Sequence, residues 1–192
     1  MKILIMGLSG SGKSTLAKKL VEILPLSIWL NADELRELYQ DWDFSREGRM
    51  RQAKRMLLLS ESAHHPYIFA DFIAALPEQR DLFKPDIIVW MNTIQSCKYE
   101  NTNAAFVPPT KWDVCFNSFE EVNVHDVLTA INSATSNFGG WADETMSSVA
   151  WRMERDGHFW GFMRPVIDWI FSPWTTGHCQ KAYESEITGL PK

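Results

Sequence analysis

The chain has 192 residues, of which 45% are hydrophobic and 22% are charged. This composition is typical of a soluble globular protein and excludes a disordered, collagen-like or coiled-coil chain. The length allows one full domain with a small appendage, but not two large domains. The formal net charge of −5 excludes long-range attraction of polyanions, so nucleic-acid binding would need a local basic patch.

The apolar runs are too short to cross a membrane. None reaches the roughly 18 to 20 residues that span a bilayer, and the first residues lack a signal-peptide pattern. We therefore expect a cytoplasmic protein without membrane contacts. The cysteines are Cys97, Cys115 and Cys179, an odd and widely spaced set that favours reduced thiols over disulfides or a zinc ribbon.

Strand-like and helix-like segments alternate from the start of the chain. The apolar run at residues 2–6 predicts a buried strand, and apolar residues recur at helical spacing over residues 14–24. Such alternation implies a mostly parallel sheet. Further strands are predicted at residues 27–30, 67–73 and 86–91, and further helices at 33–39, 46–60 and 77–83.

The pattern changes after the two prolines at residues 108–109. A last strand is predicted at residues 114–116 and an amphipathic helix at 124–134, and five of the nine tryptophans lie beyond residue 137. We expect a five-stranded α/β domain at residues 1–122 and a Trp-rich helical module at 123–192. The tryptophans are more typical of a small core than of a ligand cage.

Residues 7–14 read G-L-S-G-S-G-K-S and satisfy the phosphate-binding pattern G-x-x-x-x-G-K-[ST]. The motif stands between a predicted strand and a predicted helix, which distinguishes it from an ordinary glycine-rich turn. Backbone N–H groups can hold phosphate oxygens there, while Lys13 supplies charge to the β and γ phosphates and Ser14 a ligand for Mg²⁺. The fold class is therefore a P-loop NTPase three-layer sandwich. The residues predicted to bind ATP are Gly7, Ser9, Gly10, Ser11, Gly12, Lys13, Ser14 and Thr15.

Four segments carry a resemblance to a known family. Residues 7–15 read G-L-S-G-S-G-K-S-T, residues 31–36 N-A-D-E-L-R, residues 44–49 F-S-R-E-G-R, and residues 72–80 F-I-A-A-L-P-E-Q-R. On these segments the first 110 or so residues resemble the adenylylsulfate kinases, which phosphorylate a nucleotide 3′-hydroxyl. Their motifs are G-L-S-G-S-G-K-S-T, D-G-D-x-x-R, F-S-x-x-x-R and F-I-S-P-x-x-x-x-R. The resemblance implies transfer of the γ-phosphate of ATP, with Mg²⁺, to a nucleotide-like acceptor.

A carboxylate close to the phosphate loop is needed in a P-loop kinase to hold the acceptor hydroxyl or to order water on Mg²⁺. Asp33 follows the second predicted strand and matches the last Asp of the family motif, so we expect it to act there. Its alternative role is to cap the helix that begins at this point. The predicted catalytic residues are Asp33, Lys13 and Arg80, and the predicted metal ligands are Ser14 and Asp33.

Three arginines fall at motif positions. The guanidinium groups of Arg36, Arg49 and Arg80 suit an acceptor phosphate or transition-state charge, although arginines are also common on solvated helix faces. Phe44 can stack on a base, as the resemblance implies, or be buried in the core. The basic run over residues 46–55 is either an exposed face or a seat for a phosphate-bearing or polynucleotide acceptor. The predicted substrate-binding residues are Arg36, Phe44 and Arg49.

The family's D-P-K-G-L-Y lid has no counterpart after residues 90–92, and residues 98–109 stand in its place. Two acceptors therefore stay open: adenylylsulfate, and a hydroxymethylated pyrimidine such as 5-hydroxymethyluracil in DNA, phosphorylated by a phage kinase during base hypermodification. A third alternative is a non-catalytic nucleotide-binding module that recruits a partner. The oligomeric state is open, a homodimer being one option.

The last 60 or so residues resemble a short phage-encoded family, through G-G-W-A-D-E-T at residues 139–145 together with 177–179 and 182–184. This implies a viral source and thus the host cytoplasm. Residues 175–178 read T-T-G-H, but too little chain follows them for a nucleotidylyltransferase domain. His158, His178 and Cys179 lack the spacing of a known zinc site.

Overall fold

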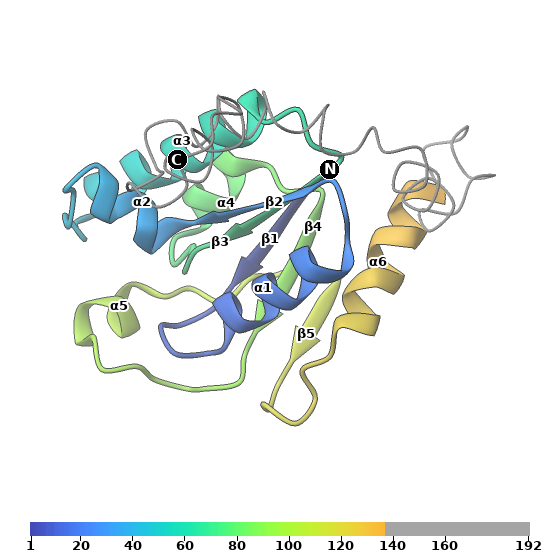
Figure 1. Cartoon of the computed structure of the whole chain (residues 1–192). Helices are drawn as coiled ribbons and strands as arrows, with labels where there is room; N and C mark the ends of the chain where they lie inside the picture. Colours follow the sequence, from blue (N-terminus) through green and yellow to red (C-terminus); the bar gives the residue numbers. More distant parts are fainter. Residues whose placement is uncertain (137–192) are drawn as a thin grey trace, which may run out of the picture. The chain divides into compact units, whose positions relative to one another are not determined.

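The computed structural model describes residues 1–136, which form a five-stranded sheet with helices on both faces (Figure 1). The strand order is β2-β3-β1-β4-β5, and every pairing is parallel. The predicted three-layer α/β fold with a parallel five-stranded sheet is confirmed. The strands are β1 (Lys2–Met6), β2 (Ser27–Asn31), β3 (Tyr67–Asp71), β4 (Ile87–Met91) and β5 (Val114–Phe116). The helices are α1 (Lys13–Ile23), α2 (Ala32–Leu38), α3 (Arg46–Ser62), α4 (Pro77–Phe83), α5 (Glu100–Ala105) and α6 (Val124–Ser136).

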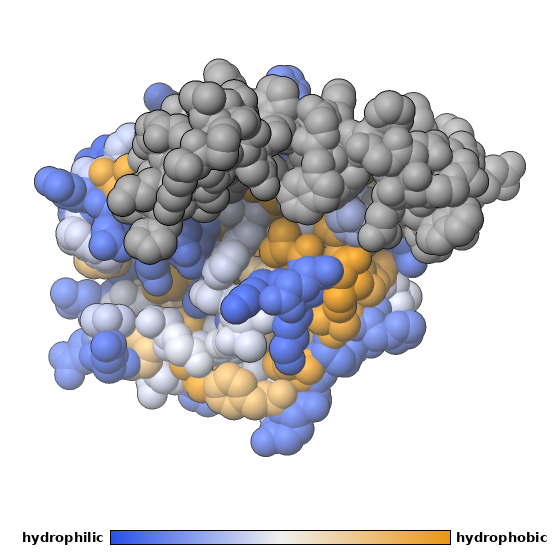
Figure 2. All heavy atoms as spheres, in the orientation of Figure 1, coloured by the Kyte–Doolittle hydropathy of each residue, from blue (hydrophilic) through white to orange (hydrophobic). Residues whose placement is uncertain are grey.

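The central strands are apolar because both of their faces are covered. Every residue of β3 and all but the first of β1 are buried. Figure 1 shows α1 and α6 on one face of the sheet and α3 and α4 on the other. Hydrophobic residues reach the surface where α1 lies beside α6 (Figure 2). This layering places the carboxyl ends of β1, β2 and β3 at one edge, where ligands of open α/β sheets bind.

Helix α5 is the one element within residues 1–136 that the sequence analysis did not predict. Its six residues, E-N-T-N-A-A, are too short and too polar to show an amphipathic period. The side chain of Asn103 fixes it, since its amide accepts from the backbone N–H of Cys97 at 2.9 Å and donates to the Cys97 carbonyl at 2.8 Å. Residues 98–109, which stand in place of the family's lid, therefore contain a short helix that is hydrogen-bonded to Cys97 in the loop before it.

The C-terminal predictions lie outside the described residues. They concern the Trp-rich module, the T-T-G-H segment at residues 175–178, and the residues His158, His178 and Cys179. The domain boundary at residue 122 stays a prediction. Helix α6, which begins just after it, contacts α1, β4 and β5. In the part of the chain that the structure describes, no helix is long and apolar enough to cross a membrane.

Candidate functional site

The phosphate-binding loop joins β1 to α1 and changes direction at three glycines. Gly7, Gly10 and Gly12 have φ angles of 146°, 90° and 92°, which disfavour any residue with a Cβ. At Gly7 a Cβ would also overlap the carbonyl oxygen of Met91, so the loop packs directly against the end of β4. Gly12 precedes α1 and supplies no capping side chain, which leaves the first N–H groups of the helix available for phosphate oxygens.

Lys13 lies in this loop with its ammonium group folded back on the backbone. Its Nζ donates to the carbonyl oxygen of Leu8 at 2.9 Å, and the residue is buried. Burial lowers the pKa of Lys13, while the nearby carboxylates of Asp71 and Asp33 act in the opposite direction. The cation therefore stands beside acidic groups in a partly dehydrated site, where a triphosphate would gain most from its charge.

Ser14 and Asp71 form the shortest polar contact of the site. The Ser14 hydroxyl, in the first turn of α1, donates to Oδ2 of Asp71, at the end of β3, over 2.6 Å. Desolvation raises the pKa of the Asp71 carboxyl, and the charge of Lys13 and the bond from Ser14 oppose that rise. A hydroxyl beside a buried carboxylate is a set of hard oxygen donors, and it fits Mg²⁺. These two residues would hold the metal that the loop motif implies.

The sequence analysis missed Asp71. Its signal was available, because four residues of β3 precede it, all of them buried, and it closes the strand at the edge where the phosphate loop lies. A carboxylate at the carboxyl end of a buried strand next to a P-loop is a common Mg²⁺ ligand in P-loop NTPases. The predicted strand extends to Ile73 and so places Asp71 in its interior.

Asp33 occupies the first turn of α2 and faces the same cavity as Lys13. The alternative that Asp33 caps this helix is wrong. Asn31 caps it instead, and its Oδ1 accepts from the backbone N–H of Asp33 at 2.9 Å. Within residues 1–136 the Asp33 carboxylate makes no hydrogen bond, so it is free to accept a proton or a hydroxyl from a ligand.

An open cavity of about 940 Å³ brings these groups together. The phosphate loop and Asp71 form one wall, Asp33 with Trp42 and Phe44 a second, and residues 98–102 a third. The volume falls in the upper part of the range for small-molecule sites and is large enough for a donor and an acceptor together. Among the residues that the structure describes, no cluster of three or more metal-ligating side chains forms a separate metal site.

Arg36 and Arg49 lie close to Phe44 but do not line the cavity. Arg36 donates from Nη1 to the carbonyl oxygens of Asp41 and Asp43, and its guanidinium lies 4.6 Å from the centre of the Phe44 ring. Arg49 donates from Nε to the carbonyl of Phe44, at 3.0 Å. Both arginines are buried. Phe44 therefore lines the cavity, while the two arginines stabilise the loop at residues 41–45 that carries Phe44.

Arg80 lies apart from the phosphate loop. Its Nη1 donates to the carbonyl oxygens of Ala74 and Val107, at 2.8 and 3.0 Å, and the residue is buried. It therefore joins the segment after β3 to the segment before β5. The structure does not bring Arg80 together with Asp33 and Lys13, and a catalytic role would require a change in this arrangement.

The basic run on α3 is largely neutralised by carboxylates. Arg51 pairs with Asp41 and Asp43, and Arg55 pairs with Asp41 at 2.6 Å. These ion pairs hold the pKa of the Asp41 carboxyl far below its usual range. The run therefore anchors the loop at residues 41–45, which carries Trp42 and Phe44, more than it forms a free positive surface.

We expect the Asp71→Asn variant to lose about 100-fold in Mg²⁺-dependent affinity for AMPPNP, because it removes the one buried anionic oxygen donor of the site. The affinity without metal should change little. In the wild type, acidification should weaken the Mg²⁺-dependent binding of AMPPNP at pH values at which an ordinary aspartate is still ionised. The reason is that the raised pKa of Asp71 favours its protonated form. Calorimetric titration at several Mg²⁺ concentrations measures both effects. Asp81→Asn, at an exposed position, is the control, and equal losses in both variants would contradict the assignment.

We expect Arg49→Lys to raise the KM for the acceptor about tenfold and to lower the free energy of unfolding by about 2 kcal/mol. Lysine cannot bridge the Phe44 carbonyl and the Thr102 hydroxyl, which Arg49 joins across two walls of the cavity. The KM for ATP should stay near the wild-type value. Steady-state kinetics and urea denaturation test this, with the exposed Lys54→Met on the same helix as control. A change in ATP KM as large as that in acceptor KM would refute the supporting role.

Comparisons with known proteins agree with this geometry. A family model described as an AAA domain matches residues 3–75, whereas no curated protein sequence matches the chain. Among solved structures, the APS kinase of Mycobacterium tuberculosis in complex with AMPPNP and APS is similar at 20% identity, with a TM-score of 0.55. The match covers 70% of this chain and 96% of that one. A gluconokinase from Sinorhizobium meliloti is similar at 15% identity, with a TM-score of 0.51, over 71% of this chain and 94% of that one. The described part of the chain therefore has the fold found in P-loop kinases.

Proposed function

We propose that this protein is a P-loop kinase that transfers the γ-phosphate of ATP to a hydroxyl of a nucleotide-like acceptor. The observation that carries the proposal is the contact between Ser14 and Asp71 in the cavity that Lys13 and Asp33 also line. A loop that only bound nucleotide would not need the free carboxylate of Asp33 in the same cavity. The similar APS kinase and gluconokinase structures support the proposal at the level of the fold.

Each side chain has a distinct part in the proposed reaction. Lys13 would leave the Leu8 carbonyl to contact the β and γ phosphates and offset the charge that develops during transfer. Ser14 and Asp71 would hold Mg²⁺, which supplies neutralisation of the phosphate oxygens when it is bound. Asp33 would orient the acceptor hydroxyl and accept its proton as the oxygen attacks the γ-phosphorus. ADP leaves with the bridging oxygen, so atoms and charge balance.

The acceptor and the nucleoside of ATP lie on opposite sides of the phosphate loop in this proposal. Asp33, Trp42 and Phe44 mark the acceptor side, so the nucleoside extends toward the end of β5. There the half-exposed ring of Phe119 lies about 3.5 Å from the position that a Cβ on Gly12 would occupy. Phe119 therefore suits a stacking contact with the base of ATP.

We expect Phe119→Ala to raise the KM for ATP about tenfold, since stacking of one base contributes about 1 to 3 kcal/mol. The turnover number should change less than threefold, because Phe119 does not line the cavity that holds Asp33. Initial rates at varied ATP test this, with Ile23→Ala, another exposed apolar position on the α1 side of the sheet, as control. An unchanged KM would place the base elsewhere.

A DNA acceptor is the second candidate, because three exposed aromatic side chains surround the cavity. Trp42, Phe44 and Tyr99 line it and are 55%, 43% and 48% exposed, and Lys98 lies beside Tyr99. Exposed rings with a nearby cation are the elements on which single-stranded nucleic acids stack. A hydroxymethylated pyrimidine in DNA would place its hydroxyl at Asp33 and neighbouring bases on these rings.

One assay separates the candidates. The full chain is incubated with γ-labelled ATP, Mg²⁺ and either adenylylsulfate or single-stranded DNA containing 5-hydroxymethyluracil. Label in adenylylsulfate supports the small-molecule kinase, and label in the DNA supports the polynucleotide kinase. ATP binding with no label in either acceptor, and no ADP formed, would favour the non-catalytic nucleotide-binding module.

A further inference from the structure

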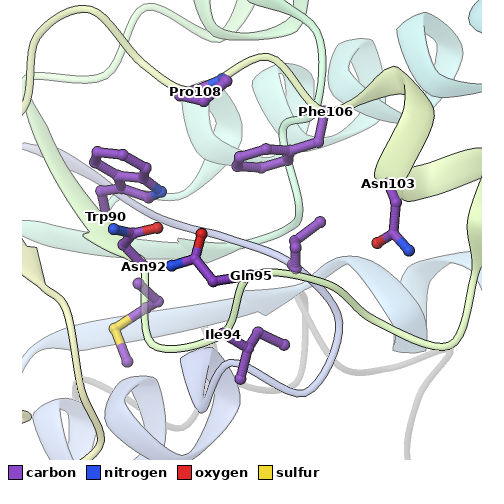
Figure 3. Close-up of a pocket in the computed structure, with 9 residues that line it drawn as sticks. Trp90, Asn92, Ile94, Gln95, Asn103, Phe106 and Pro108 are labelled. Atoms are coloured by element: carbon purple, nitrogen blue, oxygen red, sulfur yellow. The ribbon is translucent and has the colours of Figure 1, made fainter.

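A second cavity adjoins the phosphate-binding loop and shares no lining residue with the first (Figure 3). It lies at the carboxyl end of β4 and has a volume of about 190 Å³. Sites for drug-sized ligands usually measure about 300 to 1,000 Å³, so this one suits a ligand of one or two rings. No charged residue lines it. Nothing in the proposed transfer reaction uses this cavity.

The walls of the second cavity are built by side chains that other contacts hold in place. The Trp90 ring packs on that of Trp112, with centroids 5.1 Å apart. The Asn92 amide donates from Nδ2 to Oδ1 of Asn117 at 3.0 Å. Asn103 is fixed by its two hydrogen bonds to Cys97. Trp90, Asn92 and Asn103 are thus positioned before any ligand enters, which lowers the entropic cost of binding.

Polar groups in the cavity are left unused. Within residues 1–136, Gln95 has no hydrogen-bond partner, and the Oδ1 atom of Asn92 accepts no hydrogen bond. Figure 3 shows the amides of Asn92 and Gln95 close together, next to the rings of Trp90 and Phe106. The cavity therefore offers amide donors and acceptors next to two aromatic rings.

This combination selects for one chemical class of ligand. Aromatic rings favour a flat partner, and paired amide donors and acceptors recognise edges that carry both kinds of group. A charged ligand is disfavoured because no countercharge lines the cavity. Pyrimidine and purine bases are neutral, flat and carry both donors and acceptors, and they match the volume.

We propose that this second cavity binds a neutral nucleobase. Leu8 lines the cavity, and its carbonyl oxygen holds the ammonium group of Lys13, so a bound base contacts the phosphate loop. The base comes either from a free nucleoside or from a polynucleotide, and both sources present the same edge and face. The proposal does not require that the protein transfer phosphate.

The test is a binding titration of the full chain, with inorganic triphosphate and Mg²⁺ present to occupy the phosphate loop without supplying a base. Thymidine, adenosine and a deoxythymidine decamer are titrated by equilibrium dialysis. We expect saturable binding of at least one of these probes, weakened about five- to tenfold by Gln95→Leu and unchanged by Ser96→Ala. Both substituted residues are exposed, so neither variant is expected to impair folding.

Each outcome has a defined meaning. Binding of a nucleoside identifies a free base as sufficient, and binding of the decamer alone identifies a polynucleotide source. Trp90→Leu should weaken either kind of binding at least as much as Gln95→Leu. Absence of binding of all three probes, or binding that neither Gln95→Leu nor Trp90→Leu weakens, would overturn the proposal. The kinase assay reports separately on the first cavity.

Discussion

The Asp33→Asn variant is expected to transfer phosphate about 10³-fold more slowly than the wild type, in line with the loss of a general base. Its affinity for Mg²⁺ and AMPPNP should stay within threefold, because the Ser14 hydroxyl contacts Asp71 and not Asp33, so we place Asp33 on the acceptor and not on the metal, as its motif position had also allowed. Asparagine keeps the size of the side chain and cannot accept the proton. Single-turnover measurement with labelled ATP isolates the transfer step.

The adjacent residue gives a matched control for this variant. Glu34 is exposed on the same helical turn but does not line the cavity. Glu34→Gln removes one negative charge beside Asp33 and should leave transfer within threefold of the wild-type rate. Equal losses in the two variants would show that overall negative charge matters and would refute a specific role for Asp33.

The Lys13→Met variant is expected to lower the transfer rate about 10³-fold and also to weaken ATP binding, because it removes the charge that contacts the phosphates. Methionine fills a similar volume, so circular dichroism should show a folded protein. Lys18→Met, at an exposed position of the same helix, should behave as the wild type. Transfer at the wild-type level in Lys13→Met would remove the phosphate loop from the mechanism.

The pH dependence of binding follows from the same lysine. Burial lowers the pKa of Lys13, so the free protein loses the ammonium charge at a lower pH than an exposed lysine would. ATP affinity should therefore decline with rising pH before ordinary lysines titrate. A bound triphosphate restores the charge by direct contact, so the decline should shift to higher pH as ATP approaches saturation.

The strands, the longer helices and the phosphate loop could be predicted because their signals are local. A buried strand is a short apolar run, and the loop needs glycines at fixed positions before a helix. Helix α5 could not be predicted, since its stability comes from the hydrogen bonds of Asn103 to Cys97 and not from a repeat in its own residues. A short polar helix of this kind depends on contacts with its neighbours.

The site was predictable to the extent that motif residues face the cavity. Lys13, Ser14, Asp33 and Phe44 do so. Arg36 and Arg49 do not, because their guanidinium groups satisfy backbone carbonyls of the loop at residues 41–45. A sequence shows that an arginine is present but not whether its partner is a ligand or a carbonyl. Asp71 shows the reverse case, since it was not predicted although its position at the end of a buried strand beside the phosphate loop is readable from the sequence pattern.

The most direct test of the kinase proposal is a crystal structure of the protein with AMPPNP and Mg²⁺. We predict the γ-phosphate in contact with Nζ of Lys13, the metal bound to the hydroxyl oxygen of Ser14, and the carboxylate of Asp33 facing the γ-phosphorus across space for a hydroxyl. A nucleotide bound outside the phosphate loop, or an Asp33 carboxylate that points away from the γ-phosphorus, would contradict it.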